Sequence, residues 1–251
     1  MNLAESQHEY TKYVTRKGDI VKVRNDIGEL TDQQKYKLTS LTGPFEKHKM
    51  FFVHIPKNAG TTVMKTIMGN MEGAVSHETA DQINSIDAYK DYKNFIFCRD
   101  PMSRFVSAYL WRLRKDKLVQ RLTIENLIEG LDTSSINQPL DDWGWEKNEY
   151  KLDRMFNPQS TWINDNTVFV GRVETMRESI RELISKYDLE PIRHSDYFRH
   201  NPAKPYGPQP EPTRQKIIKI LSDSKHLQNK FFDHYKDDYE NFNYEKPKEL
   251  R

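Results

Sequence analysis

Three short apolar segments, each followed by a turn and then by a helix-type pattern, constrain the fold of this chain most strongly. The segments cover residues 50–55, 94–98 and 167–171, and the expected helices cover residues 61–68, 102–115 and 174–187. Apolar strands that alternate with helices are typical of a parallel sheet, because the connecting helices bury both of its faces. The sequence therefore predicts an α/β fold of three layers, with a central parallel sheet flanked by helices.

The remaining segments predict smaller elements and contain no linker that would divide the chain. We expect a hairpin within residues 9–27, short helices at 31–41 and 124–131, a proline-rich loop at 198–212 and a last amphipathic helix from 213 towards 235. The prediction is one domain over residues 1–251, in which residues 1–45 form an N-terminal extension without an assigned role.

Charge and composition exclude several classes of protein. The chain carries 39 Lys and Arg against 37 Asp and Glu, a net charge of +2, so nucleic-acid binding through bulk electrostatics is not expected. The one cysteine, Cys98, allows neither an intramolecular disulfide nor a cysteine zinc site, and no metal is expected. No segment has the roughly 20 apolar residues of a membrane span or a signal-peptide core, so we expect a cytoplasmic protein.

The turn at residues 56–62 has the composition of an anion-binding loop. It connects an expected strand to an expected helix, whose first N–H groups and dipole favour negative charge. Gly60 allows the backbone to approach a ligand, Lys57 adds a positive charge, and Thr61 and Thr62 add hydroxyl donors. In the nucleotide-triphosphatase motif, by contrast, the lysine directly precedes the hydroxyl residue. Here it lies three positions before the glycine, so the standard Mg²⁺ arrangement is not supported.

A second cluster, residues 99–109, also lies where an expected strand ends and a helix begins. Asp100 can cap that helix, and Pro101 fits its first turn. Arg99 and Ser107 could converge on a second phosphate, since arginine offers a forked set of donors. The alternative is structural: Asp100 and Arg104 form an ion pair, and Ser107 is a small packing residue.

Together the two clusters resemble the motifs of sulfotransferases that use 3′-phosphoadenosine 5′-phosphosulfate (PAPS). Residues 56–62 resemble the 5′-phosphosulfate loop of that family, and residues 99–109 resemble its 3′-phosphate motif. The chain is most similar to carbohydrate sulfotransferases of the heparan sulfate 2-O and chondroitin/HNK-1 type. The resemblance extends over about residues 50–244, through further blocks at 157–160, 170–174 and 235–244.

The resemblance implies a P-loop-like fold, PAPS as donor and adenosine 3′,5′-bisphosphate as product. The residues that it assigns to donor binding are Lys57, Asn58, Ala59, Gly60, Thr61, Thr62, Arg99, Ser107 and Arg172. Lys57 would also be catalytic, because it could stabilise the charge that develops on the leaving phosphate.

His77 is the implied general base, because related glycan sulfotransferases carry a catalytic histidine after the first helix. Imidazole titrates near neutral pH, which suits proton transfer from an acceptor hydroxyl. Glu78 is either an alternative base or a partner that orients His77. His54, on the preceding strand, is expected to be structural.

The acceptor is expected to be a hydroxyl-bearing molecule of the carbohydrate class, a glycan or glycolipid, with a small hydroxylated metabolite left open. Residues 141–145 are the candidate acceptor lid, and Trp111 and Trp162 are expected in the core. Two other functions remain open: a P-loop-like kinase that acts on a small molecule, and a nucleotide-binding module without catalysis. The sequence does not predict the oligomeric state.

Overall fold

The structure is a computed structural model of the chain. It describes residues 10–14, 20–24, 47–68, 77–86, 89–115, 123–134, 152, 154–189 and 210–251. The predicted helix at 31–41, the candidate acceptor lid at 141–145 and residues 198–209 of the proline-rich loop lie outside the described residues.

The three predicted strands form one parallel sheet. They are β3 (Met50–Phe52), β4 (Lys93–Cys98) and β5 (Thr167–Arg172), in the order β3-β4-β5. Phe52 pairs with Phe95, and Phe97 pairs with Gly171. The strand β3 is shorter than the predicted segment, although the N–H of Val53 still donates to the carbonyl of Phe95 at 3.0 Å. The predicted α/β class with a parallel sheet is confirmed.

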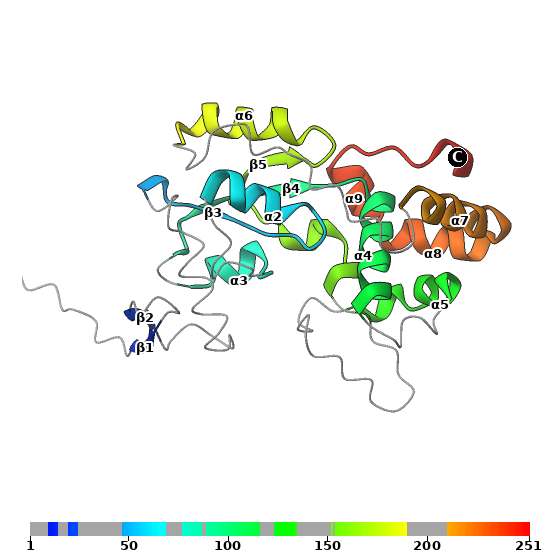
Figure 1. Ribbon diagram of the computed structural model, residues 1–251, viewed down its shortest axis with the longest axis horizontal. Coiled ribbons are helices and arrows are strands. Elements are labelled where there is room, and N and C mark those ends of the chain that lie inside the picture. Colours follow the sequence, from blue (N-terminus) through cyan, green and yellow to red (C-terminus); the bar gives the residue numbers. More distant parts are fainter. Residues whose placement is uncertain are drawn as a thin grey trace, which may run out of the picture.

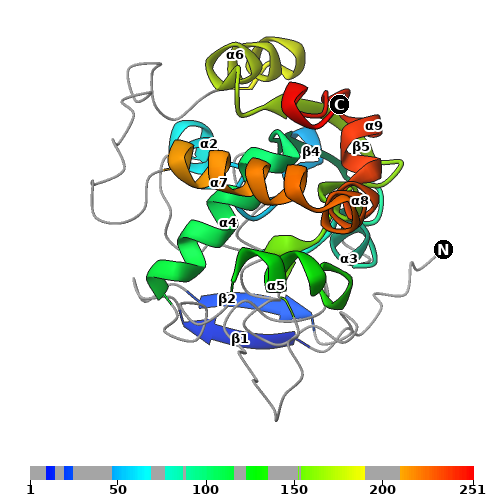
Figure 2. The same cartoon turned by 90° about the vertical axis from the view of Figure 1, so that its right-hand side faces the viewer.

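Helices lie on both sides of this sheet, as Figures 1 and 2 show. In both views α6 (Met176–Tyr187) lies above the strands and α3 (Ala80–Asn84) lies below them. The predicted helix after β3 is α2 (Gly60–Val63), which continues as the π-helix η2 (Met64–Met68). The helix after β4 is α4 (Pro101–Lys115).

Two other predictions are confirmed outside the sheet. The N-terminal hairpin consists of β1 (Tyr10–Val14) and β2 (Ile20–Arg24), paired antiparallel. The predicted short helix at 124–131 is α5 (Ile124–Glu129), followed by the 3₁₀ turn η5 (Leu131–Thr133).

The prediction of one last helix from 213 towards 235 is wrong. The segment forms α7 (Pro210–Asp223), α8 (Lys225–His234) and α9 (Lys236–Asn241), and α7 begins inside the predicted proline-rich loop. The break has a local cause, because Ser224 adopts an extended conformation and its hydroxyl accepts from the N–H of Leu227 at 3.3 Å. A serine in this position caps a new helix rather than continuing the old one. A short 3₁₀ turn, η9 (Lys248–Leu250), follows near the C-terminus.

The buried apolar side chains of the described residues form two clusters. One lies between the sheet and its helices and includes Phe51, Phe95 and Trp162. The other joins α4, α5, α7 and α8, with Phe105 and Phe231 at its centre. Two 3₁₀ turns contribute one to each cluster: η6 (Arg154–Phe156) to the second and η7 (Gln159–Trp162) to the first. Trp162 is buried as expected, whereas Trp111 is only partly buried, at the edge of the second cluster.

None of the helices in the described ranges combines the length and the apolar character that crossing a membrane requires.

Gly171 provides a test of packing in the sheet. A Cβ atom at this position would lie 2.5 Å from the Phe97 ring, which is buried and packs against the rings of Phe52 and Phe169. Because that ring has no room to move, Gly171→Ala should lower the free energy of unfolding by about 1–3 kcal/mol. Gly130→Ala is the control, since a Cβ there would be 3.4 Å from the nearest atom. Chemical denaturation that shows equal stabilities for the two variants would contradict this packing.

Candidate functional site

The loop after β3 turns the chain sharply from strand to helix. Lys57 has a φ of 70° and Ala59 a φ of 55°, both in the left-handed region. The carbonyl of Ala59 then accepts from the N–H groups of Thr62 and Val63, at 2.8 and 3.2 Å. Left-handed residues beside a helix start create a concave group of N–H donors, which is an anion-binding arrangement. The side chain of Thr61 is exposed here and that of Thr62 is half-buried.

Gly60 is required in this loop because the His54 ring packs directly on its backbone. A Cβ atom at residue 60 would lie 1.9 Å from Nε2 of His54. The His54 ring is buried, and its centroid lies 4.3 Å from that of His77. Burial, followed by the charges of His77 and Lys57, lowers the pKa of His54 well below its ordinary value. The His54 ring is therefore neutral and forms the floor of the loop, which agrees with the expected structural role.

The second cluster begins with the predicted cap. The Asp100 carboxylate accepts from the N–H of Ser103 at 2.8 Å, and α4 starts at Pro101. The alternative ion pair between Asp100 and Arg104 is wrong. The buried Arg104 guanidinium donates instead to the carbonyls of Pro56, at 3.1 Å, and Asn157, at 2.6 Å. Ser107 lies further along α4 with a half-buried side chain.

The two clusters meet at the carboxyl ends of the neighbouring strands β3 and β4. Nη1 of Arg99 donates to the carbonyl of Lys57 at 3.3 Å. Nδ2 of Asn58 donates to the carbonyl of Phe97 at 2.7 Å and to Oε1 of Gln159 at 2.6 Å. The same Oε1 accepts from the N–H of Arg99 at 2.8 Å. The structure thus joins residues 39 and 42 positions apart in the sequence, at the edge of the sheet where parallel α/β proteins bind ligands.

Gln159 is a residue of this site that the sequence did not reveal. Residues 157–160 stood out only as part of a resemblance, and no role followed from it. A glutamine in a polar segment gives no sign of burial, yet Gln159 is 0% exposed.

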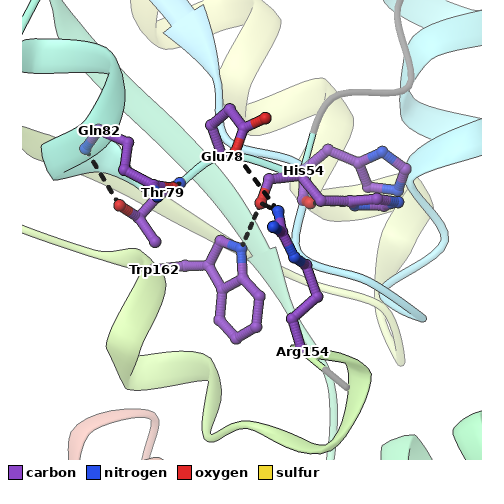
Figure 3. A network of polar contacts seen from close by, with 7 residues as sticks. His54, Glu78, Thr79, Gln82, Arg154 and Trp162 are labelled. Carbon is purple, nitrogen blue, oxygen red and sulfur yellow. Dashed lines mark hydrogen bonds and ion pairs between the residues drawn. The ribbon is translucent and has the colours of Figure 1, made fainter. Parts of the chain in front are cut away.

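His77 and Glu78 are held in place by a second network, shown in Figure 3. Nδ1 of His77 lies 2.8 Å from the carbonyl of His54, and a carbonyl can only accept, so Nδ1 carries the proton. In its neutral form the ring therefore has its lone pair on Nε2. The carbonyl of His77 accepts from Nη1 of Arg154 at 2.9 Å and from Nε1 of Trp162 at 3.4 Å.

Glu78 is buried and paired with Arg154. Its Oε2 lies 3.3 Å from Nη1 of Arg154, and both side chains are almost fully buried. The next residue, Thr79, is the N-cap of α3. Its N–H donates to the side-chain oxygen of Gln82, and its hydroxyl accepts from the N–H of Gln82. These bonds fix the backbone immediately after His77.

Arg172 is close in the sheet, but its side chain contacts the C-terminal segment. It pairs with Cys98 in the β4–β5 register, donates to the carbonyl of Phe242 and lies 4.6 Å from the centroid of the Tyr244 ring. The Tyr244 hydroxyl donates to Glu174 at 2.9 Å. Burial raises the pKa of the Cys98 thiol, which keeps it protonated and fits a packing role.

The comparison with protein families decides the classification. The model of the Sulfotransferase family matches residues 45–245, which includes both clusters and all later blocks. The chain belongs to the sulfotransferase family. It is therefore a sulfotransferase enzyme, from a family whose members use PAPS as the sulfuryl donor. Neither the search of curated proteins nor the search of solved structures found a significant match.

The loop and its surroundings fit the charged groups of such a donor. The sulfotransferase has a glycine at residue 60, where no side chain fits, and left-handed backbone at residues 57 and 59, which is a conformation found in anion-binding loops. The side chain of Lys57 extends over Trp111, with Nζ 5.4 Å from the ring centroid. Within the described ranges, no group of three or more His, Cys, Asp or Glu side chains could hold a metal ion.

Several positive charges gather around Lys57 in the sulfotransferase. Burial of the ammonium lowers the pKa of Lys57 to about 8, and the charges of Arg114, Arg99, Arg112 and Arg104 contribute in that order. Burial likewise lowers the pKa of Arg99. Such crowding of cations is unfavourable without a counter-charge, so an anion that binds here stabilises the charged form of Lys57.

The low pKa of Lys57 predicts that anion binding weakens as the pH rises through about 8. In the free protein, Lys57 loses its proton in this pH range. In the complex the anion keeps Lys57 protonated, so above this pH binding requires the uptake of a proton. Calorimetry with inorganic sulfate, which stays fully ionised, should show an affinity that falls by up to about tenfold per pH unit above that value. Lys57→Arg keeps its charge over this range and should show a flat profile. An equally steep decline in that variant would assign the pH dependence to another group.

Proposed function

We propose that this sulfotransferase transfers the sulfuryl group of PAPS to a hydroxyl of a carbohydrate acceptor, a glycan or glycolipid. The observation that carries the proposal is the contact between the Lys57 loop and Arg99 at neighbouring strand ends, at 3.3 Å. Two adjacent anion sites suit one nucleotide that carries two separate charged groups. The family match favours sulfuryl transfer over the kinase and over a module without catalysis.

In this proposal, residues 57–62 bind the 5′-phosphosulfate of the donor. Lys57 and the N–H groups at the start of α2 contact its oxygens, and Thr61 and Thr62 add hydroxyl donors. Arg99 and Ser107 bind the 3′-phosphate. Arg172 contacts the nucleotide from the end of β5, although in the structure its guanidinium is held by Phe242 and Tyr244.

The donor supplies the sulfuryl group, and the protein supplies charge and a proton acceptor. A bond forms between the acceptor oxygen and sulfur, while the bond between sulfur and the 5′-phosphate oxygen breaks. Lys57 and the loop amides stabilise the negative charge on the departing phosphate. The product is adenosine 3′,5′-bisphosphate.

His77 is the proposed general base. Its Nδ1–H is directed to the carbonyl of His54, so the lone pair on Nε2 takes the proton from the acceptor hydroxyl. Two roles were open for Glu78, an alternative base or a partner that orients His77. Its buried ion pair with Arg154 favours the orienting role.

The carbohydrate class of the acceptor and a cytoplasmic location are part of this proposal. The acceptor class rests on the resemblance of the two motifs to carbohydrate sulfotransferases.

Calorimetry with two nucleotides tests the donor. Adenosine 3′,5′-bisphosphate should bind, and ATP with Mg²⁺ should bind more weakly. Arg99→Ala and Ser107→Ala should each weaken bisphosphate binding, with a loss of about tenfold or more for Arg99→Ala, because a charge-assisted bond to phosphate is lost. Lys219→Ala, at an exposed ion pair on α7, is the control. Preference for ATP, or unchanged affinity in Arg99→Ala, would contradict the proposed donor site.

Replacement of His77 separates catalysis from donor binding. His77→Asn retains an N–H that can reach the carbonyl of His54 but removes the base, so turnover should fall by about 10²–10⁴-fold. Bisphosphate affinity should stay within about threefold of wild type, since His77 is not assigned to the donor. The exposed His226 gives the control variant His226→Asn. Parallel loss of turnover and donor affinity in His77→Asn would show a structural role instead.

A further inference from the structure

The side-chain amide of Gln159 bonds to both proposed phosphate-binding motifs. Its Oε1 accepts from Nδ2 of Asn58 at 2.6 Å and from the N–H of Arg99 at 2.8 Å. Its Nε2 donates to the carbonyl of Arg99 at 2.8 Å and to Oδ2 of Asp238 at 3.1 Å. These four bonds use both lone pairs and both N–H groups of the amide.

Asp238, on α9, fixes the orientation of this amide. Its carboxylate accepts from the N–H of Gln159 at 2.9 Å and from the N–H of Ser160 at 2.8 Å. Because a carboxylate only accepts, Nε2 of Gln159 must face Asp238. Its Oε1 therefore faces the N–H groups of Asn58 and Arg99. Gln159 and Asp238 are both 0% exposed, so water cannot replace these bonds without opening the core.

Gln159 bonds to neither the Arg99 guanidinium nor the Lys57 ammonium, the charged groups that are proposed to contact the two phosphates. Arg99 is held by its backbone N–H and carbonyl, so its guanidinium remains directed towards the Lys57 loop. Asn58 is held by its side chain, which also bonds to the carbonyl of Phe97, at the end of β4. The amide therefore fixes where one motif lies relative to the other.

We propose that Gln159 is a positioning residue that sets the separation of the two phosphate-binding motifs, so that both phosphates of one nucleotide bind at once. The inference rests on the proposed function and adds a residue that touches neither phosphate. When two sites are held at the correct distance, the second phosphate binds without a further loss of translational freedom. A nucleotide with two phosphates then binds far more tightly than one with either phosphate alone.

The test compares three probes: adenosine 3′,5′-bisphosphate, adenosine 5′-monophosphate and adenosine 3′-monophosphate. In Gln159→Met, which keeps the side-chain length but removes all four bonds, bisphosphate affinity should fall by about tenfold or more. The affinity for each monophosphate should change by less than about threefold, because each motif keeps its own donors. A residue with only a structural role would weaken all three probes alike.

Two further variants keep the test decisive. Asp238→Asn preserves the shape of the core but weakens the hold on the Gln159 amide, and it should show a smaller loss for the bisphosphate alone. If Gln159→Met does not fold, Asp238→Asn alone provides the test. Gln228→Met is the control, since it removes a glutamine bond to the carbonyl of Leu250, at 3.0 Å, in the C-terminal region.

The outcomes separate this inference from the proposed function. A wild-type protein that does not bind the bisphosphate overturns the donor assignment and this inference with it. If the wild type binds and Gln159→Met or Asp238→Asn loses affinity equally for all three probes, or for none, this inference alone is overturned. Loss confined to the bisphosphate supports it.

Discussion

The hydrogen bonds of one buried amide, that of Gln159, connect the segments on which the site depends. The amide joins the loop after β3, the end of β4 and the C-terminal helix α9 through Asn58, Arg99 and Asp238. Arg104 makes a second buried connection, from α4 to the carbonyls of Pro56 and Asn157. Buried polar groups of this kind are costly when a partner is lost. Loss of either side chain would therefore leave buried polar groups of these loops without a partner.

Charge and burial then give the site its chemical character. The His54 ring packs against the backbone of Gly60, so no side chain fits at residue 60 and the loop keeps this conformation only with glycine there. Lys57 lies among arginines, and burial lowers its pKa, so an anionic group relieves an existing repulsion. His77 is directed by the carbonyl of His54, and Arg154 holds its backbone. The site thus combines a positively charged region that favours anions with a histidine whose ring is oriented to accept a proton.

The sequence predicted the features that arise from local patterns. Apolar strands followed by helices specify a parallel sheet, and the loop at 56–62 and the cap at Asp100 follow from residue type and spacing. The break at Ser224 was missed, because an apolar periodicity that continues past a serine does not show the cap. Gln159 and Arg154 were missed for another reason. Their roles arise from contacts with residues 60 or more positions away, which no local pattern records.

The central claim is that this protein moves a sulfuryl group, and transfer of radiolabelled sulfate from PAPS measures it most directly. Wild-type protein incubated with labelled donor and a broad panel of hydroxylated acceptors, glycans included, should place label on a carbohydrate. Lys57→Ala should lose that transfer, because the charge that stabilises the departing phosphate is removed. Binding of adenosine 3′,5′-bisphosphate without transfer of label to any acceptor, or full transfer by Lys57→Ala, would contradict the account.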